Sequence, residues 1–261
     1  MRNTAFLVAL IVLGTATLGD CLPEAARASQ HVALQTRFIP DRLGKATTIE
    51  FGFRVSSLTL GKAPSPVTEV SLDLPAGLGL ATSTLGLAQC TPSILLEQGP
   101  SGCPANSRVG TGTARAELPS EGEVLTETAV VQALLGPPVN EAEQVLFYAE
   151  ANTPVSAQLV FPGLVLLAPS ARYGGRLDTA IPLIPTWIDG PDIAVTSFSS
   201  TLGPLGLTYY RHIHGKIVPF KPKGIAVPTR CPRGGFPFRA DFTFLDGTRA
   251  STTSTVACPG A

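Results

Sequence analysis

The stretch Phe236-Pro237-Phe238-Arg239-Ala240-Asp241-Phe242-Thr243-Phe244 decides the fold class of this chain. Apolar side chains stand at every second position, and Pro, Arg, Asp and Thr stand between them. Because successive side chains of a β-strand point to opposite faces of the sheet, four phenylalanines and one alanine share one face. This pattern is typical of an antiparallel strand with one buried face and one face in water.

The same alternation recurs along the chain, most clearly in residues 47–55. Further strand candidates lie near residues 32–38, 70–74, 108–118, 124–135, 144–151, 155–168, 192–200 and 206–218. Gly and Pro account for 26 and 24 of the 261 residues and fall mostly between these segments, where turns need them. We therefore predict an all-β protein, an antiparallel β-sandwich of Greek-key or immunoglobulin-like type, either as one domain or as two packed sub-domains that meet near residue 119.

One short helix is expected near residues 92–98. Thr91 is a good capping residue, Pro92 suits the first helical position, and Gly99 ends the pattern.

The N-terminus has the three parts of a secretory signal peptide. Arg2 supplies a positive charge, residues 5–19 contain no ionisable side chain, and Ala26-Arg27-Ala28 is a small-residue cleavage site. The apolar run is shorter than the roughly 20 residues of a membrane span. We predict a signal peptide at 1–28, a secreted domain at 29–261 without a transmembrane anchor, and an extracytoplasmic location, secreted or associated with the cell envelope.

A lipoprotein cut just before Cys21 is the alternative. Asp20 opposes it, because a signal peptidase pocket that accepts small neutral side chains should reject a carboxylate.

The charge balance gives no sign of two common classes of partner. The chain has 19 basic and 19 acidic residues, and loss of residues 1–28 removes two of each, so the net charge stays at zero. Neither a nucleic acid nor an anionic membrane surface is indicated.

Four cysteines remain after cleavage, and an even number in an exported chain indicates disulfides. Cys90 and Cys103 bracket the expected helix, and Cys231 and Cys258 bracket a C-terminal hairpin. A two-residue turn at Asp246-Gly247 would bring residue 235 opposite Cys258, close to Cys231. We therefore predict local pairing in both halves. A zinc site would need ligands at shorter spacing.

Two weaker patterns could form ligand sites. His212 and His214 would point the same way on a strand and could ligate a metal, although Lys216 would share that face. The sequence offers no third ligand, and a solvated polar strand face is the interpretation that we prefer. The lone tryptophan, Trp187, precedes Asp189 and Asp192, and an aromatic platform beside carboxylates is a common design for carbohydrate sites, to which Tyr209 or Tyr210 could add a second ring.

Motifs of catalysis and cofactor binding are absent from the sequence. The chain lacks G-x-S-x-G, H-E-x-x-H, a Walker A loop, the dinucleotide fingerprint G-x-G-x-x-G and an acidic calcium loop. We expect no enzyme activity and no cofactor.

Two cysteine-containing motifs resemble those of a known group. Leu74-Pro75-Ala76-Gly77-Leu78, Cys90 and the segment 103–110 follow LPxGL…C…CPxxSxVG, and residues 231–259 follow CPxGGFxF…DG…CP. Both are similar to modules of uncharacterised exported β-rich proteins of high-GC bacteria. The resemblance implies an exported, disulfide-bonded bacterial β-protein, and it brings no activity or catalytic residue with it.

The sequence thus favours an exported, non-enzymatic extracellular or cell-envelope domain with a structural or binding role. A carbohydrate-binding or carbohydrate-cleaving module is the first alternative, and a metal-binding domain is the second. The partner is unknown; an envelope component and a polysaccharide are the two candidates.

We predict that the secreted form begins at Ser29. N-terminal sequencing of the protein from culture supernatant or envelope fractions tests this, and a lipidated Cys21 or a retained Met1 would contradict it.

Overall fold

The computed structural model describes residues 30–80, 88–120, 123–154, 156–168, 170–187 and 189–259. The predicted signal peptide, residues 1–28, and the predicted first residue Ser29 lie outside the described residues. Within the described ranges, none of the helices has the length and apolar character that crossing a membrane requires.

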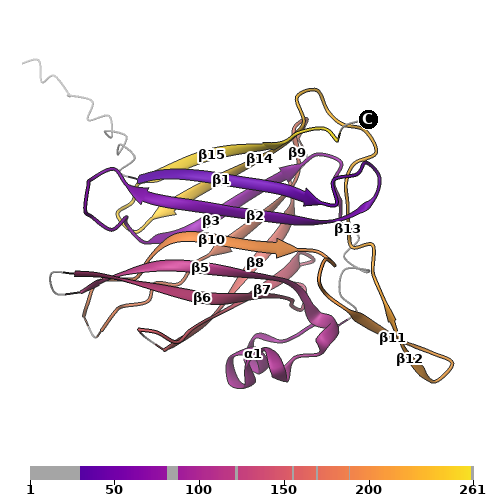
Figure 1. Cartoon of the computed structure of the whole chain (residues 1–261), viewed down its shortest axis with the longest axis horizontal. Coiled ribbons are helices and arrows are strands. Elements are labelled where there is room, and N and C mark those ends of the chain that lie inside the picture. Colours follow the sequence, from indigo (N-terminus) through magenta and orange to yellow (C-terminus); the bar gives the residue numbers. More distant parts are fainter. Residues whose placement is uncertain are drawn as a thin grey trace, which may run out of the picture.

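One antiparallel sheet of thirteen strands makes up most of the molecule (Figure 1). Its order is β15-β14-β3-β9-β8-β7-β6-β5-β10-β2-β13-β4, and β1 pairs with β2. The strands are β1 (Gln30–Ile39), β2 (Ala46–Ser57), β3 (Val67–Pro75), β4 (Gly79–Leu80), β5 (Arg108–Ser120), β6 (Glu123–Leu135), β7 (Glu143–Ala151), β8 (Ala157–Leu167), β9 (Tyr173–Ala180), β10 (Ala194–Leu202), β13 (Ile225–Ala226), β14 (Phe236–Phe244) and β15 (Arg249–Val256). A separate hairpin consists of β11 (Tyr209–Ile213) and β12 (Lys216–Phe220).

The sheet curls until its ends, β1 and β15, lie side by side, which gives a nearly closed, barrel-like shape (Figure 1). Side chains join this seam. Thr36 Oγ1 lies 3.0 Å from Ser254 Oγ, and the Gln30 amide accepts from Thr248 Oγ1 at 2.9 Å. The prediction of an all-β antiparallel fold is confirmed, and the nearly closed sheet is consistent with the predicted sandwich-like arrangement. The proposed sub-domain boundary at Pro119 falls inside β5, where this residue pairs with Val124 and the sheet continues.

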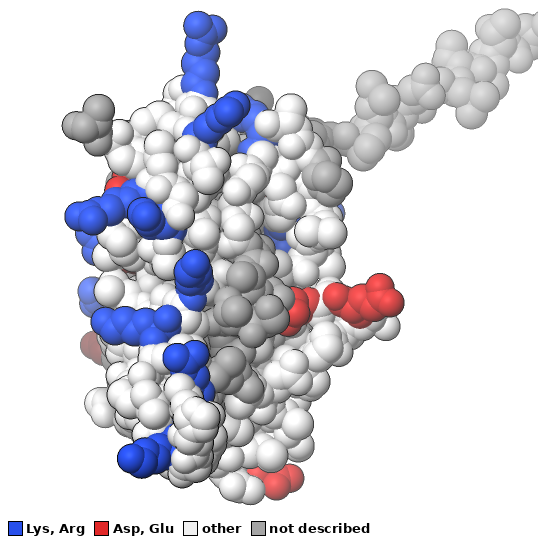
Figure 2. Space-filling view, turned by 90° about the vertical axis from the view of Figure 1, so that its right-hand side faces the viewer, with Lys and Arg blue, Asp and Glu red and all other residues white. Residues whose placement is uncertain are grey.

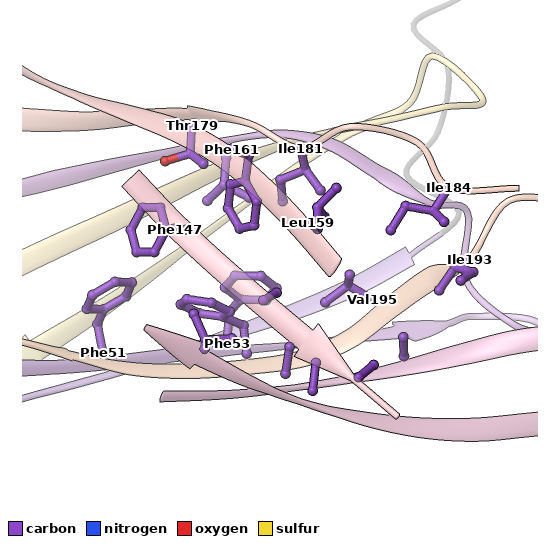
Figure 3. A pocket seen from close by; sticks show the side chains of 18 of the residues that line it. Phe51, Phe53, Phe147, Leu159, Phe161, Thr179, Ile181, Ile184, Ile193 and Val195 are labelled. Carbon is purple, nitrogen blue, oxygen red and sulfur yellow. The ribbon is translucent and has the colours of Figure 1, made fainter. Parts of the chain in front are cut away.

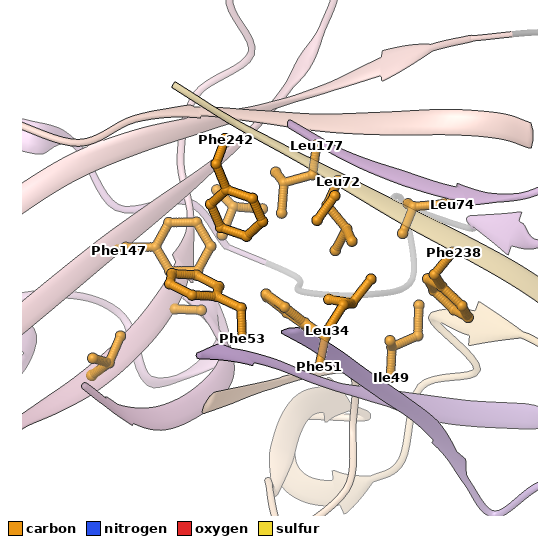
Figure 4. Close-up of a cluster of buried hydrophobic side chains, with 14 of the residues drawn as sticks. Leu34, Ile49, Phe51, Phe53, Leu72, Leu74, Phe147, Leu177, Phe238 and Phe242 are labelled. Atoms are coloured by element: carbon orange, nitrogen blue, oxygen red, sulfur yellow. The ribbon is translucent and has the colours of Figure 1, made fainter. Parts of the chain in front are cut away.

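The inward faces of the strands form a single hydrophobic core. Figure 4 shows phenylalanines and leucines from several strands converging there. Five phenylalanine rings from five strands make a continuous chain across the interior, with successive centroids 5.1, 5.5, 6.1 and 5.4 Å apart: Phe242, Phe53, Phe198, Phe147 and Phe161. The alternation in β2 and β14 produces this core, because it turns their phenylalanines inward.

The predicted short helix is confirmed as α1 (Pro92–Gln98), followed by 3₁₀ turns η2 (Gly99–Gly102) and η3 (Ala105–Ser107). The Thr91 side chain accepts a bond from the Ile94 amide at 3.4 Å, and Gly99 ends the helix with φ of 64°. Leu95 is fully buried in a second, smaller cluster with Leu134 and Leu146. The helix therefore covers the outer face of β6 and β7.

Both predicted disulfides are present. Cys90 bonds Cys103 and Cys231 bonds Cys258, with Cα–Cα distances of 5.3 and 5.8 Å.

The predicted register of the last hairpin is wrong by one residue. Thr243 pairs with Arg249, so the loop has three residues, Leu245 to Gly247, in place of two. Gly247 has φ of 79°, which closes the longer loop in the left-handed conformation that glycine adopts easily. The β14 side chains that point into the core are still the ones predicted, because alternation along the strand determines them and the register does not.

We expect loss of the Cys231–Cys258 bridge, by changing both residues to Ala, to lower the free energy of unfolding by about 2–5 kcal/mol. The Cys90–Cys103 bridge closes a shorter loop, 13 against 27 residues. Its loss should cost about 0.6 kcal/mol less in the loop-entropy account. Urea unfolding of the two double variants tests this, and a larger loss for the first pair would contradict it.

Candidate functional site

The interior of the barrel contains a cavity of about 130 Å³ that the side chains leave unfilled. Figure 3 shows part of its lining, with phenylalanines on one side and Leu159, Ile181 and Val195 on another. Of the 24 described residues that line it, two are polar, Glu127 and Thr179. The cavity is therefore an apolar space with one ionisable group.

A row of small side chains creates this space. The strand registers place four alanines beside one another on neighbouring strands β5, β6, β7 and β8: Ala114, Ala129, Ala151 and Ala157. The same row continues through two phenylalanines on β10 and β2, Phe198 and Phe53. This row of methyl groups lies beside bulky side chains of the same and neighbouring strands, and together they do not fill the interior.

The unfilled volume has an energetic consequence. Missing packing destabilises a core by about 24 cal/mol per Å³, so a cavity of about 130 Å³ corresponds to about 3 kcal/mol of forgone stability. A bound apolar molecule would recover part of that energy. The volume is close to that of an engineered apolar cavity of about 150 Å³ that binds benzene.

The hairpin between β9 and β10 lies at one end of the barrel, which we call the rim of the cavity. Ile184 and Ile193 line the cavity from this segment, and the Ile193 amide donates to the Ile184 carbonyl at 2.8 Å. Thr186 and Pro191 form a second backbone bond of 2.9 Å within the hairpin. The hairpin therefore holds two isoleucines over one end of the barrel.

Glu127 lies in the wall near this rim. It pairs with Ala116, which also pairs with Val195, so these three residues form the row above the alanines. Glu127 is only 5% exposed, and its Oε1 atom has no hydrogen-bond partner among the described residues. Of the three buried side-chain oxygens in that situation, only that of Glu127 lines the cavity.

Sequence reasoning placed Glu127 in a strand near 124–135 without assigning it a role. One signal was present: Glu127 has the same parity as Ala129, Val131 and Ala133, which the structure turns inward. A charged residue on the same alternating face of a strand as the buried residues marks a candidate site, because a carboxylate that points inward is costly without a partner.

The residues suggested for a carbohydrate site fall into two separate groups. Trp187, Asp189 and Asp192 belong to the rim hairpin before β10, and Tyr209 and Tyr210 follow β10 at its other end (Figure 1). The Trp187 ring packs against Gly190 and is 48% exposed. Tyr209 is fully buried, and its hydroxyl donates to the Arg108 carbonyl at 2.8 Å. The structure does not bring these residues together.

The two suggested metal ligands are also differently placed. His212 is in β11, whereas His214 lies beyond the end of that strand, in the turn, with φ of 48°. The expectation that both point the same way from one strand is wrong because the strand ends at Ile213. Nowhere in the described residues do three His, Cys, Asp or Glu side chains gather in a group that could hold a metal ion.

A second, polar hollow of about 390 Å³ lies on the barrel wall across β1, β2, β10 and β5. Arg37 and Glu50 form an ion pair there at 2.6 Å, and Arg54 and Arg115 also line it. Its polar character distinguishes it from the interior cavity.

Basic side chains are concentrated at one end of the molecule. Figure 2, which faces the side that carries β11 and β12, shows many Lys and Arg residues there. The segment 193–240 contains no Asp or Glu and seven basic residues, Arg211, Lys216, Lys221, Lys223, Arg230, Arg233 and Arg239. The net charge of zero therefore conceals an uneven distribution.

Comparison with known proteins adds no assignment: no family model, curated protein or solved structure matches this chain.

Burial raises the pKa of Tyr209 to about 12, from about 10 for a free tyrosine. The folded state therefore holds this proton at pH values where the unfolded state loses it. We expect the free energy of unfolding to fall as the pH rises from about 10 to about 12, by on the order of 2 kcal/mol.

Unfolding in urea at a series of alkaline pH values measures this loss. Tyr209→Phe removes the ionisable group and serves as the comparison. If that variant loses as much stability as the wild type over this range, another group is responsible; Tyr148, whose pKa burial also raises, is the next to test.

Proposed function

We propose that this protein is an exported, non-enzymatic binding domain that holds a small apolar molecule inside its barrel. The observation that carries the proposal is the cavity of about 130 Å³ with 22 apolar residues among its 24 lining residues. Ligand sites are typically concave, mostly apolar and equipped with few polar groups.

The chemistry of the lining supports binding rather than catalysis. Among the described residues of the lining, Glu127 and Thr179 alone could transfer a proton or act as a nucleophile. Glycoside hydrolysis commonly uses two carboxyl groups, and acyl transfer uses a nucleophile with an adjacent base. A single carboxylate in an apolar space suits recognition.

The two disulfides support the extracytoplasmic part of the proposal. Such bonds persist in oxidising compartments and are rare in the bacterial cytoplasm. An envelope component of apolar character is therefore a suitable class of ligand.

Benzene and octanol are suitable first probes because they match the size and polarity of the cavity. We expect each to raise the melting temperature of the mature domain in a concentration-dependent way, since a ligand that binds only the folded state stabilises it. Differential scanning calorimetry measures the shift.

The matched variants are Ala129→Leu and Val130→Leu, which change adjacent positions of β6. Ala129 lines the cavity, and Val130 is 58% exposed on the outer face. The larger side chain at 129 should fill the space, abolish the ligand effect and stabilise the free protein by about 1–2 kcal/mol. The change at 130 should leave binding intact. Equal ligand shifts in both variants would place the binding elsewhere.

A further inference from the structure

We propose that the ligand is a cationic amphiphile, whose ammonium group binds Glu127 while its apolar part occupies the cavity. This inference rests on the proposed function and specifies the chemistry of its ligand. It starts from a buried acceptor without a donor.

One oxygen of the Glu127 carboxylate, Oε1, is buried without a hydrogen-bond donor among the described residues. This oxygen accepts no hydrogen bond in the described part of the chain, and Glu127 is 5% exposed to solvent. The three ion pairs of the described residues join Arg37 to Glu50, Arg176 to Asp73 and Arg239 to Asp241. A buried charge is costly unless it is paired, so a donor from a ligand would remove a real penalty.

The position of Glu127 along β6 fits an amphiphile lying along the barrel. The last β6–β7 pair is Ala129 with Ala151, and Glu127 lies two residues beyond it toward the rim. Val131, deeper in the wall, is four residues from Glu127, which is about 13 Å along a strand. An amphiphile with its head group at the rim and its apolar chain directed toward the phenylalanines would place each part against a surface of matching polarity.

The charge of the head group follows from the acceptor. A carboxylate accepts hydrogen bonds and cannot donate them, and a bond from a charged donor is roughly twice as strong as one from a neutral donor. A second carboxylate would be repelled. The cavity should therefore prefer an amine to an alcohol of the same chain length, and an alcohol to a carboxylic acid anion.

Three octyl compounds with different head groups test the preference directly. Isothermal titration of the mature domain at pH 7 with octylamine, octanol and octanoate should give about tenfold tighter binding of octylamine than of octanol, and the weakest binding for octanoate.

Two substitutions locate the effect. Glu127→Gln should weaken octylamine binding to about the level of octanol, and should weaken octanol binding far less because a neutral hydroxyl bonds the carboxylate less strongly. Glu123→Gln removes the same charge from an exposed position of the same strand and should leave the preference intact.

The possible outcomes separate the two proposals. If octanol binds and octylamine binds no more tightly, the cationic head group is wrong and the apolar binding function stands. If none of the three compounds binds, the proposed function itself fails. Because the wild-type series alone measures the preference, the test holds even if Glu127→Gln does not fold; a preference that survives in a folded Glu127→Gln protein would assign it to another group.

Discussion

The packing of phenylalanines across the barrel interior is the interaction on which the structure depends. Phe242, Phe53, Phe198, Phe147 and Phe161 come from five different strands, and each ring contacts the next. β2 and β14 have no backbone pairing with each other, and the contact between Phe53 and Phe242 joins their inner faces across the core. Aromatic pairs of this kind add about 0.5–1.5 kcal/mol each beyond their buried area. Closure of the sheet brings these rings together, and their burial stabilises the closed sheet.

The register of the strands that close the barrel also explains why its interior is not filled. Once the register aligns Ala114, Ala129, Ala151 and Ala157, this stretch of the wall presents only methyl groups to the interior. A leucine at one of these positions would serve stability better, as protein interiors are normally packed to the density of organic crystals. The chain instead combines this space with an inward carboxylate, which also lowers stability on its own. These two adjacent departures from good core design are the reason for proposing a binding site here.

The local features of the fold could be predicted from the sequence, and the long-range ones could not. Alternation identified β14 and β2, the capping pattern identified α1, and spacing around the helix and the hairpin identified the cysteine pairs. The cavity depends on which residues of β5, β6, β7 and β8 lie side by side, and a sequence shows no register between strands. The carbohydrate hypothesis failed to account for the length of β10, which separates Trp187 from Tyr209. The histidine pair was misplaced because the boundary of a short strand decides whether two alternate residues share a face. In the last hairpin, one added loop residue shifted the pairing.

The uneven distribution of charge gives the molecule an electric dipole along the barrel. Basic residues of the β11–β12 hairpin and the segment after it lie at one end, whereas Glu117, Glu123, Asp189 and Asp192 lie near the cavity rim at the other. In the field of a charged surface such a molecule experiences a torque even though its net charge is zero. Near a negatively charged surface the basic end would turn inward and the rim outward, over distances of about 8–10 Å at physiological ionic strength. An electrically neutral protein can in this way present one chosen end to its surroundings.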